Sequence, residues 1–210
     1  MRMIVVSWMA EVSDEFGLQP ETLHLGVALL DRFLSAAAPH GVPRGVLQMV
    51  AVACIMVAGK DLEVSHPTVE QLTAIAANCF TPQDLLRMER VLLDALDFTV
   101  CTQTAFTFLH LFAQGLDCLP AHVAALAVYL LDLTLLDYGL LSFPPSQLAA
   151  GALTLAMHTY GLGPAPVADT LRLAGYAPAD MAAVSGCLLH LHQNAAWCGA
   201  PSALRPEWFV

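Results

Sequence analysis

The 210-residue chain carries 18 acidic and 8 basic side chains, and 57% of its residues are hydrophobic. This composition supports a large core and excludes a disordered chain, and a net charge of −10 with scattered basic residues disfavours binding to nucleic acid. The uncharged apolar run near residues 46–59 is shorter than the roughly 18 residues that span a bilayer, so we expect no membrane-spanning helix.

Proline residues mark helix starts along the whole chain. Proline is tolerated in the first turn of a helix and disfavoured later, so each of these residues indicates a beginning. No segment shows the alternation of apolar and polar residues that is typical of a strand. We therefore predict an all-α chain whose helices begin near Pro20, Pro43, Pro67, Pro82, Pro120, Pro145, Pro164 and Pro178.

The two halves of the chain repeat the same series of helices. The third helix of each half, at 46–59 and 148–161, is apolar all round and must be surrounded by other helices. We predict two tandem five-helix units, each around a central buried helix, with a boundary near residues 99–103. The segments that match are 43–60 with 145–161, 65–76 with 165–175, and 81–96 with 177–191.

Lys60 is the only lysine of the chain and follows an uncharged apolar stretch at 49–59. Glu89 lies in a helix with an N-cap at Thr81, and its neighbours one turn away are all leucine (Leu85, Leu86, Leu92 and Leu93). A carboxylate on an apolar face costs several kcal/mol unless it is paired, so we predict that Lys60 pairs with Glu89. The pattern leaves two roles open: an ion pair that stabilises the fold, or a polar pair preset beneath a binding surface.

Three further residues stand out in the first helices. Arg2 and Asp31 are both set among apolar residues, and we expect them to form a structural ion pair across two helices. Trp8 lies one turn from Ile4 and Val5, and its pattern fits either a core residue or a docking surface.

Cysteine and histidine give no sign of catalysis. The six cysteines form no CxxC pair and mostly occupy apolar helical patterns, which predicts reduced, buried thiols at Cys54, Cys79, Cys101, Cys118, Cys187 and Cys198. His190 and His192 are two residues apart, so on a helix they point in different directions. Nucleophile motifs and a glycine-rich phosphate loop are lacking in the sequence. We expect a protein that is not an enzyme and that binds no metal or cofactor.

These segments together resemble the A and B type mitotic cyclins. The cyclin box of this family is similar to the segment MRMIVVSWMAEVSDEFGLQPETLHLGVALLDRFLS. Two further cyclin-like segments follow at nearly the family spacing, RGVLQMVAVACIMVAGKDLEV and RMERVLLDALDF. The segment LLDYGLLSFPPSQLAAGALTLA resembles the C-terminal cyclin fold. The resemblance implies an N-terminal cyclin box at 1–98, a C-terminal cyclin fold at 103–197 and a tail at 198–210.

The resemblance implies a non-catalytic subunit that activates a cyclin-dependent serine/threonine kinase, controls cell-cycle progression and docks substrates, in the nucleus and cytoplasm. It assigns Arg2 and Asp31 to an internal pair. It places kinase contacts at Lys60, Glu89, Asp61, Leu62, Glu63, Val57, Leu93 and Phe98. It implies a patch for arginine-x-leucine motifs of substrates or inhibitors at Met1, Ile4, Val5, Trp8, Glu11, Leu47 and Gln48.

The sequence departs from the family at several points. Asp61 stands where the family usually places an aromatic residue or leucine, a departure that bears on kinase affinity. The loop SAAAPHGVPRG is longer than in typical A cyclins. The chain starts at the first helix of the box, so we expect it to lack the additional N-terminal helix that many cyclins lay on the kinase, and to lack a destruction box.

An alternative function keeps the fold and changes the role. The chain would then be a divergent cyclin-fold module for protein interaction or transcription, without kinase activation. The acidic charge disfavours the version of this module that faces DNA. The version found in pocket proteins is compatible with the charge but does not require Lys60 together with Glu89.

Overall fold

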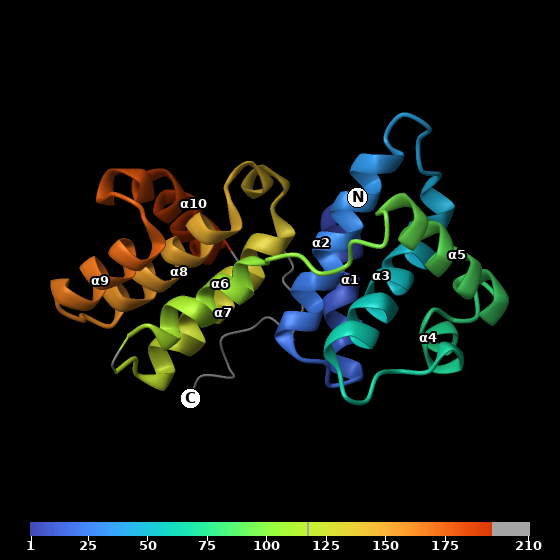
Figure 1. Ribbon diagram of the computed structural model, residues 1–210, viewed down its shortest axis with the longest axis horizontal. Helices are drawn as coiled ribbons and strands as arrows, with labels where there is room; N and C mark the ends of the chain where they lie inside the picture. Colours follow the sequence, from blue (N-terminus) through green and yellow to red (C-terminus); the bar gives the residue numbers. More distant parts are fainter. Residues whose placement is uncertain (117, 195–210) are drawn as a thin grey trace. The chain divides into compact units, whose positions relative to one another are not determined.

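The computed structural model describes residues 1–116 and 118–194, and the chain divides into two compact units, unit 1 at Met1–Thr102 and unit 2 from Gln103 onward (Figure 1). Within the described residues both units consist of helices and connecting turns, without strands. The all-α prediction is therefore confirmed. The division falls beside the predicted boundary at 99–103, and the predicted tail at 198–210 lies outside the described residues.

Unit 1 is built around one central helix. α3 packs against α1, α2, α4 and α5, as Figure 1 shows, and all its residues from Val50 to Gly59 are buried. The predicted central buried helix is confirmed, although it extends to Leu62 and so includes Lys60 in its last turn. The helices described in unit 1 are α1 (Arg2–Glu15), α2 (Pro20–Ala37), α3 (Leu47–Leu62), α4 (Val69–Ile75) and α5 (Pro82–Ala95), with a 3-10 turn η1 (Arg44–Val46) before α3.

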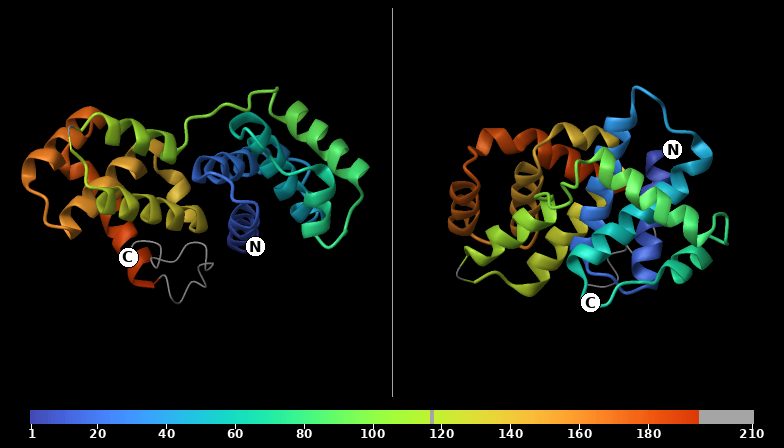
Figure 2. Two further views of the ribbon diagram at one scale, coloured as in Figure 1. Left: turned by 90° about the horizontal axis from the view of Figure 1, so that it is seen from below. Right: turned by 45° about the vertical axis from the view of Figure 1, so that its right-hand side comes forward.

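Unit 2 repeats this arrangement around α8. α8 packs against α6, α7, α9 and α10, and the helices of unit 2 are seen from two further directions in Figure 2. α8 begins and ends slightly earlier than the predicted 148–161, since Pro145 opens it directly. The described elements are α6 (Ala105–Gln114), α7 (Ala121–Leu136), η2 (Tyr138–Ser142), α8 (Pro145–Thr159), α9 (Pro164–Ala174), η3 (Pro178–Asp180) and α10 (Met181–Asn194).

Local capping explains where α5 begins. The Thr81 hydroxyl accepts a hydrogen bond from the Asp84 backbone N–H, and the Asp84 carboxylate accepts hydrogen bonds from the Thr81 hydroxyl and backbone N–H. These bonds form a reciprocal capping box with Pro82 at the first helical position, as the sequence predicts. The Thr81 hydroxyl and backbone N–H lower the pKa of the Asp84 carboxyl below its ordinary value.

The segment Arg44–Leu62 is long and apolar enough to cross a membrane, by length and composition alone. The expectation that this segment is too short to span a bilayer was wrong. The turn η1 and helix α3 together are 19 residues long, which is longer than the uncharged stretch at 46–59. In the structure the middle of this segment is buried against the other helices of unit 1. That is the environment of a core helix in a bundle.

The prediction of mostly buried cysteines was wrong. Among the cysteines that the structure describes, Cys54 is buried and burial raises its thiol pKa, whereas Cys79, Cys101, Cys118 and Cys187 are exposed; all five are free thiols. Three of the exposed residues, Cys79, Cys101 and Cys118, lie outside the helices. Cys198 lies outside the described residues.

The close packing of α8 on α10 predicts the effect of one added methyl group. A Cβ at Gly151 would lie 2.5 Å from Cγ1 of the fully buried Val184, a β-branched side chain with little rotamer freedom. Gly151→Ala is therefore expected to lower the free energy of unfolding by about 1–3 kcal/mol in denaturant titrations.

The matched control is Gly186→Ala in α10, where an added Cβ would meet nothing within 4 Å. This variant is expected to raise the free energy of unfolding by about 0.5–1 kcal/mol, because alanine loses less backbone entropy in a helix. A Gly151→Ala variant as stable as Gly186→Ala would contradict the packing described for α8.

Candidate partner-binding site

Lys60 and Glu89 join the last turn of α3 to the middle of α5. The Lys60 Nζ donates a hydrogen bond of 2.6 Å to Glu89 Oε1, so the pair expected from the sequence is present. The Lys60 side chain is 39% exposed and that of Glu89 is 16% exposed. An ion pair with this much contact with water contributes little to stability. The ammonium also keeps further N–H groups that can donate to a partner.

The surroundings of Glu89 differ from the expected apolar face. Leu85 and Leu92 are fully buried, but Leu93 is only partly buried and Leu86 is exposed. Glu89 therefore lies at the border between the buried and exposed sides of α5. The prediction of an apolar face around Glu89 was wrong for Leu86, because leucines at helical spacing can lie outside the side of α5 that packs against the other helices.

The apolar residues that the resemblance assigns to the kinase contact lie on α3, on α5 and just after α5. Leu62 and Phe98 are exposed, Phe98 by 67%, and Leu93 is partly buried. Val57, which the resemblance assigns to the kinase contact, is only 5% exposed. Val57 belongs to the core of unit 1 and offers almost no surface to a partner, because it faces inward one turn before Lys60.

The backbone at Phe98 adopts a conformation that bulky residues rarely take. Asp97 and Phe98 have φ values of 50° and 55°, in the left-handed region that favours glycine. The Phe98 backbone N–H donates to the Leu93 carbonyl at 2.9 Å and closes the end of α5. This turn places a large aromatic ring in solvent at a cost in backbone energy, which is a feature of functional positions. Nothing in the sequence pattern indicated it.

Asp61 and Glu63 are both engaged within unit 1. Asp61 is exposed, and the Cys101 thiol donates to its carboxylate, with the sulfur 3.7 Å from Oδ2. Glu63 Oε1 accepts hydrogen bonds from the Gln19 backbone N–H at 2.7 Å and from the Thr22 hydroxyl at 2.6 Å. Sequence reasoning missed Gln19 and Thr22. A signal was present, since Gln19 stands at an N-cap position where Ser, Thr, Asp or Asn is preferred.

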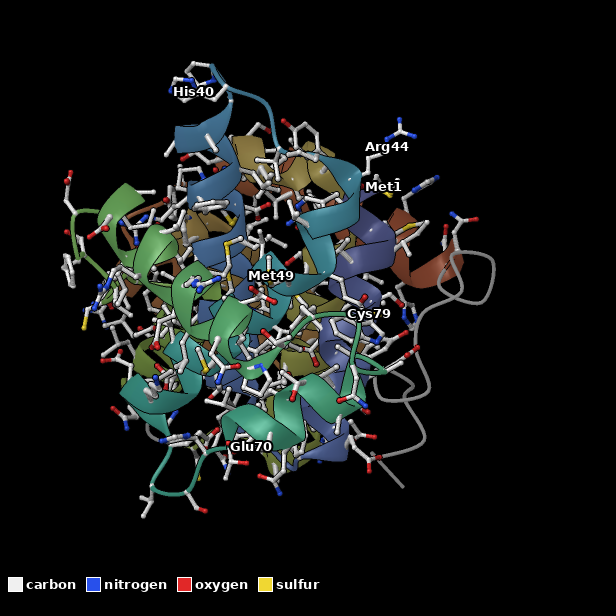
Figure 3. All side chains as sticks on the ribbon, turned by 90° about the vertical axis from the view of Figure 1, so that its right-hand side faces the viewer. Met1, His40, Arg44, Met49, Glu70 and Cys79 are labelled. Carbon is white, nitrogen blue, oxygen red and sulfur yellow. The ribbon has the colours of Figure 1, made fainter. Side chains whose placement is uncertain are left out.

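The predicted docking residues lie along α1 and in the first turn of α3. Met1, Ile4 and Glu11 are exposed, and the others are partly buried. Figure 3 views unit 1 with Met1 and Arg44 labelled near the starts of these two helices. Arg2 and Asp31 form the expected pair through two hydrogen bonds of 2.7 and 2.8 Å, which fix the first turn of α1 on α2. The partly buried members are Val5, Trp8, Leu47 and Gln48.

A groove of roughly 470 Å³ continues from this patch along α1. Trp8 lines it, so its side chain is accessible and not enclosed in the core. Two carboxylates, Glu11 and Glu15, stand on the same wall. Sequence reasoning missed the opposite wall, which α4 supplies, because that wall is contributed by residues about 60 positions further along the chain. The lining residues are Trp8, Glu11, Val12, Glu15, Phe16, Gln71, Ala74 and Ile75.

The described residues hold no group of three His, Cys, Asp or Glu side chains that could bind a metal ion. What unit 1 presents is a part-exposed ion pair with apolar neighbours at one place and an acidic groove with an apolar patch at another. Both combine polar and apolar contacts, which is the composition of surfaces that bind other proteins.

Comparison with protein families matches both halves of the chain. Residues 1–101 match the model described as "Cyclin, N-terminal domain", and residues 103–204 match "Cyclin, C-terminal domain". Cyclin-A1-3 of Oryza sativa subsp. japonica is 38% identical over 98% of this chain and 41% of its own length. The G2/mitotic-specific cyclin-2 of Medicago sativa is 40% identical over 76% of this chain and 47% of its own length. The chain thus spans less than half of either relative.

Solved structures share the fold. A viral cyclin from herpesvirus saimiri superposes with a TM-score of 0.80 at 22% identity, covering 92% of this chain and 85% of its own. A chain from the CAK complex of Chaetomium thermophilum, bound to ATP-gamma-S, gives a TM-score of 0.58 at 15% identity, covering 97% of this chain and 69% of its own. The predicted pair of tandem cyclin folds is confirmed.

The strained turn at Phe98 predicts an unusual response to mutation. Phe98→Gly removes an exposed ring and places glycine at a positive φ, so relief of strain offsets the added entropy of the unfolded chain. The free energy of unfolding is expected to stay constant or rise by about 1 kcal/mol. Phe98→Ala is the control, since it removes the ring and keeps the strain. A loss of stability in Phe98→Gly that exceeds the loss in Phe98→Ala would contradict this account.

Proposed function

The chain belongs to the cyclin family, and from this premise we propose that it binds and activates a cyclin-dependent serine/threonine kinase and thereby controls cell-cycle progression. Cyclins are regulatory subunits and not enzymes, and the relatives of this chain are A-type and G2/mitotic cyclins. We propose the nucleus and cytoplasm as its locations.

The Lys60–Glu89 pair is the observation that supports this function. Its 2.6 Å hydrogen bond sets both side chains in place, yet Lys60 remains 39% exposed. A pair this exposed contributes little to the stability of the fold, so a structural role alone accounts poorly for the only lysine of the chain. A pair left at the surface is available to the kinase segment that becomes ordered on binding. This observation favours the binding role over the purely structural one.

The second surface supports docking of substrates or inhibitors that carry arginine-x-leucine motifs. The exposed Met1 and Ile4 offer apolar area to a leucine side chain. Glu11 and Glu15, on the wall of the groove that continues from this patch, offer carboxylates to an arginine. Charge complementarity of this kind raises the specificity and association rate of binding.

The kinase contact predicts that Lys60→Ala has a large effect on kinase binding and a small effect on stability. Kinase affinity is expected to fall by roughly 2–5 kcal/mol, because groups of the interface then remain desolvated without partners. The free energy of unfolding should change by about 1 kcal/mol or less, because the pair is part-exposed. Titration calorimetry with a panel of cyclin-dependent kinases and denaturant unfolding measure the two quantities on the same protein.

Glu89→Ala is the matched variant and should behave in the same way. Large losses of stability in both variants, with binding impaired only through unfolding, would show that the pair serves the fold. Stable variants that bind and activate the kinase normally would contradict both roles. Such a result would support the alternative of a cyclin-fold interaction module without kinase activation.

The docking surface predicts a separate effect of Trp8. Trp8→Ala should weaken the binding of an arginine-x-leucine peptide by about 2 kcal/mol or more, as buried aromatic anchors do, and leave kinase affinity nearly unchanged. Lys60→Ala is the cross-control and should leave peptide binding intact. Fluorescence anisotropy with a labelled peptide measures the first effect. Loss of the folded state in Trp8→Ala would instead identify Trp8 as a core residue.

A further inference from the structure

The carboxylate of Glu63 occupies the start of helix α2. Its Oε1 atom accepts two hydrogen bonds, one from the Gln19 backbone N–H at 2.7 Å and one from the Thr22 hydroxyl at 2.6 Å. Hydrogen bonds to an ionised acceptor are about twice as strong as those between neutral groups. Glu63 is thus bound to a helix that starts more than 40 residues earlier in the chain.

Glu63 accepts a hydrogen bond from the backbone N–H of Gln19, the N-cap residue of helix α2. In the structure Gln19 makes no side-chain capping bond, and Pro20 at the first helical position has no N–H. A carboxylate at the N-terminus of a helix also interacts favourably with the helix dipole. Glu63 therefore takes the part of the acid in a capping box, which accepts from the N-cap backbone N–H, and it comes from a distant part of the sequence.

The same residue ends helix α3. The Glu63 backbone N–H donates to the Gly59 carbonyl at 2.9 Å, and its own backbone is extended. Lys60 lies between these two residues. The turn that carries Lys60 is thus held by the Glu63 carboxylate on α2 and by the Glu89 carboxylate on α5.

We propose that Glu63 is a positioning residue, which sets the last turn of α3 and with it the Lys60 ammonium for kinase binding. The inference rests on the proposed function and changes the role that resemblance gave to Glu63. With both hydrogen bonds on one oxygen directed into unit 1, Glu63 acts through Lys60 and not through a charged contact with the kinase. Thr22 shares this role from the α2 side.

Three variants separate positioning from contact. Glu63→Ala removes the acceptor, Glu63→Gln keeps an oxygen that can accept both hydrogen bonds, and Thr22→Val removes one donor with little change in volume. Thr22 is fully buried, so it cannot touch a partner. Kinase affinity, peptide affinity, thermal unfolding and hydrogen exchange of the Gln19 amide are measured for each variant and for the double variant Glu63→Ala/Thr22→Val.

Positioning predicts a specific pattern. Glu63→Ala should lower kinase affinity roughly tenfold, and Glu63→Gln should retain most of the wild-type affinity. Thr22→Val alone should lower kinase affinity a few-fold. Added to Glu63→Ala, Thr22→Val should cause no further loss, because the hydrogen bond is already absent. Exchange of the Gln19 amide should accelerate roughly tenfold in Glu63→Ala. Binding of an arginine-x-leucine peptide should not change, which separates a local effect from general unfolding.

Other results would overturn the inference. If Glu63→Gln loses as much affinity as Glu63→Ala and Thr22→Val has no effect, the charge of Glu63 touches the kinase directly. If Glu63→Ala does not fold, the kinase affinities of Glu63→Gln and Thr22→Val still distinguish positioning of Lys60 from direct contact with the kinase. A wild-type chain that binds no cyclin-dependent kinase would overturn the proposed function and the inference with it. Normal wild-type binding with no loss in Glu63→Ala would overturn the inference alone.

Discussion

Burial of an all-apolar helix is the constraint from which the rest of unit 1 follows. α3 has no polar side to give to water between Val50 and Gly59, so α1, α2, α4 and α5 must cover it on every side. The polar residues of α3 are then restricted to its ends. Lys60, Asp61 and Glu63 follow the buried stretch directly, and each reaches a different neighbour. Burial of the apolar part of α3 thus determines where the polar residues of the proposed binding site lie.

The two charged pairs of unit 1 are placed at edges of the bundle. Arg2 with Asp31 and Lys60 with Glu89 are each partly in contact with water. The more exposed Lys60–Glu89 pair contributes little to stability, whereas the Arg2–Asp31 pair is more buried and joins α1 to α2 through two hydrogen bonds. The energy that holds unit 1 together comes mainly from the buried apolar side chains. The chain can therefore keep its only lysine at the position that we propose for the kinase contact, without depending on it to fold.

α3 also connects the two surfaces that we propose for binding. Leu47 and Gln48 in its first turn belong to the docking patch, and Lys60 in its last turn belongs to the kinase contact. A helix of 16 residues is roughly 24 Å long, so the surfaces are well separated on unit 1. This separation allows one partner to bind without displacing the other, and it makes the effects of mutations at the two sites independent.

The sequence by itself determined the all-helical fold, its repetition, the central helix of each unit and the Lys60–Glu89 and Arg2–Asp31 pairs. Each of these follows from periodicity and from the cost of an unpaired charge among apolar residues, which are properties of a short segment. The tertiary structure alone decided that Leu86 is exposed, that α4 forms the second wall of the groove and that Glu63 accepts hydrogen bonds at the start of α2. These depend on which arc of a helix its neighbours cover and on which distant donors lie within hydrogen-bond reach. A pattern within one helix carries no information about either.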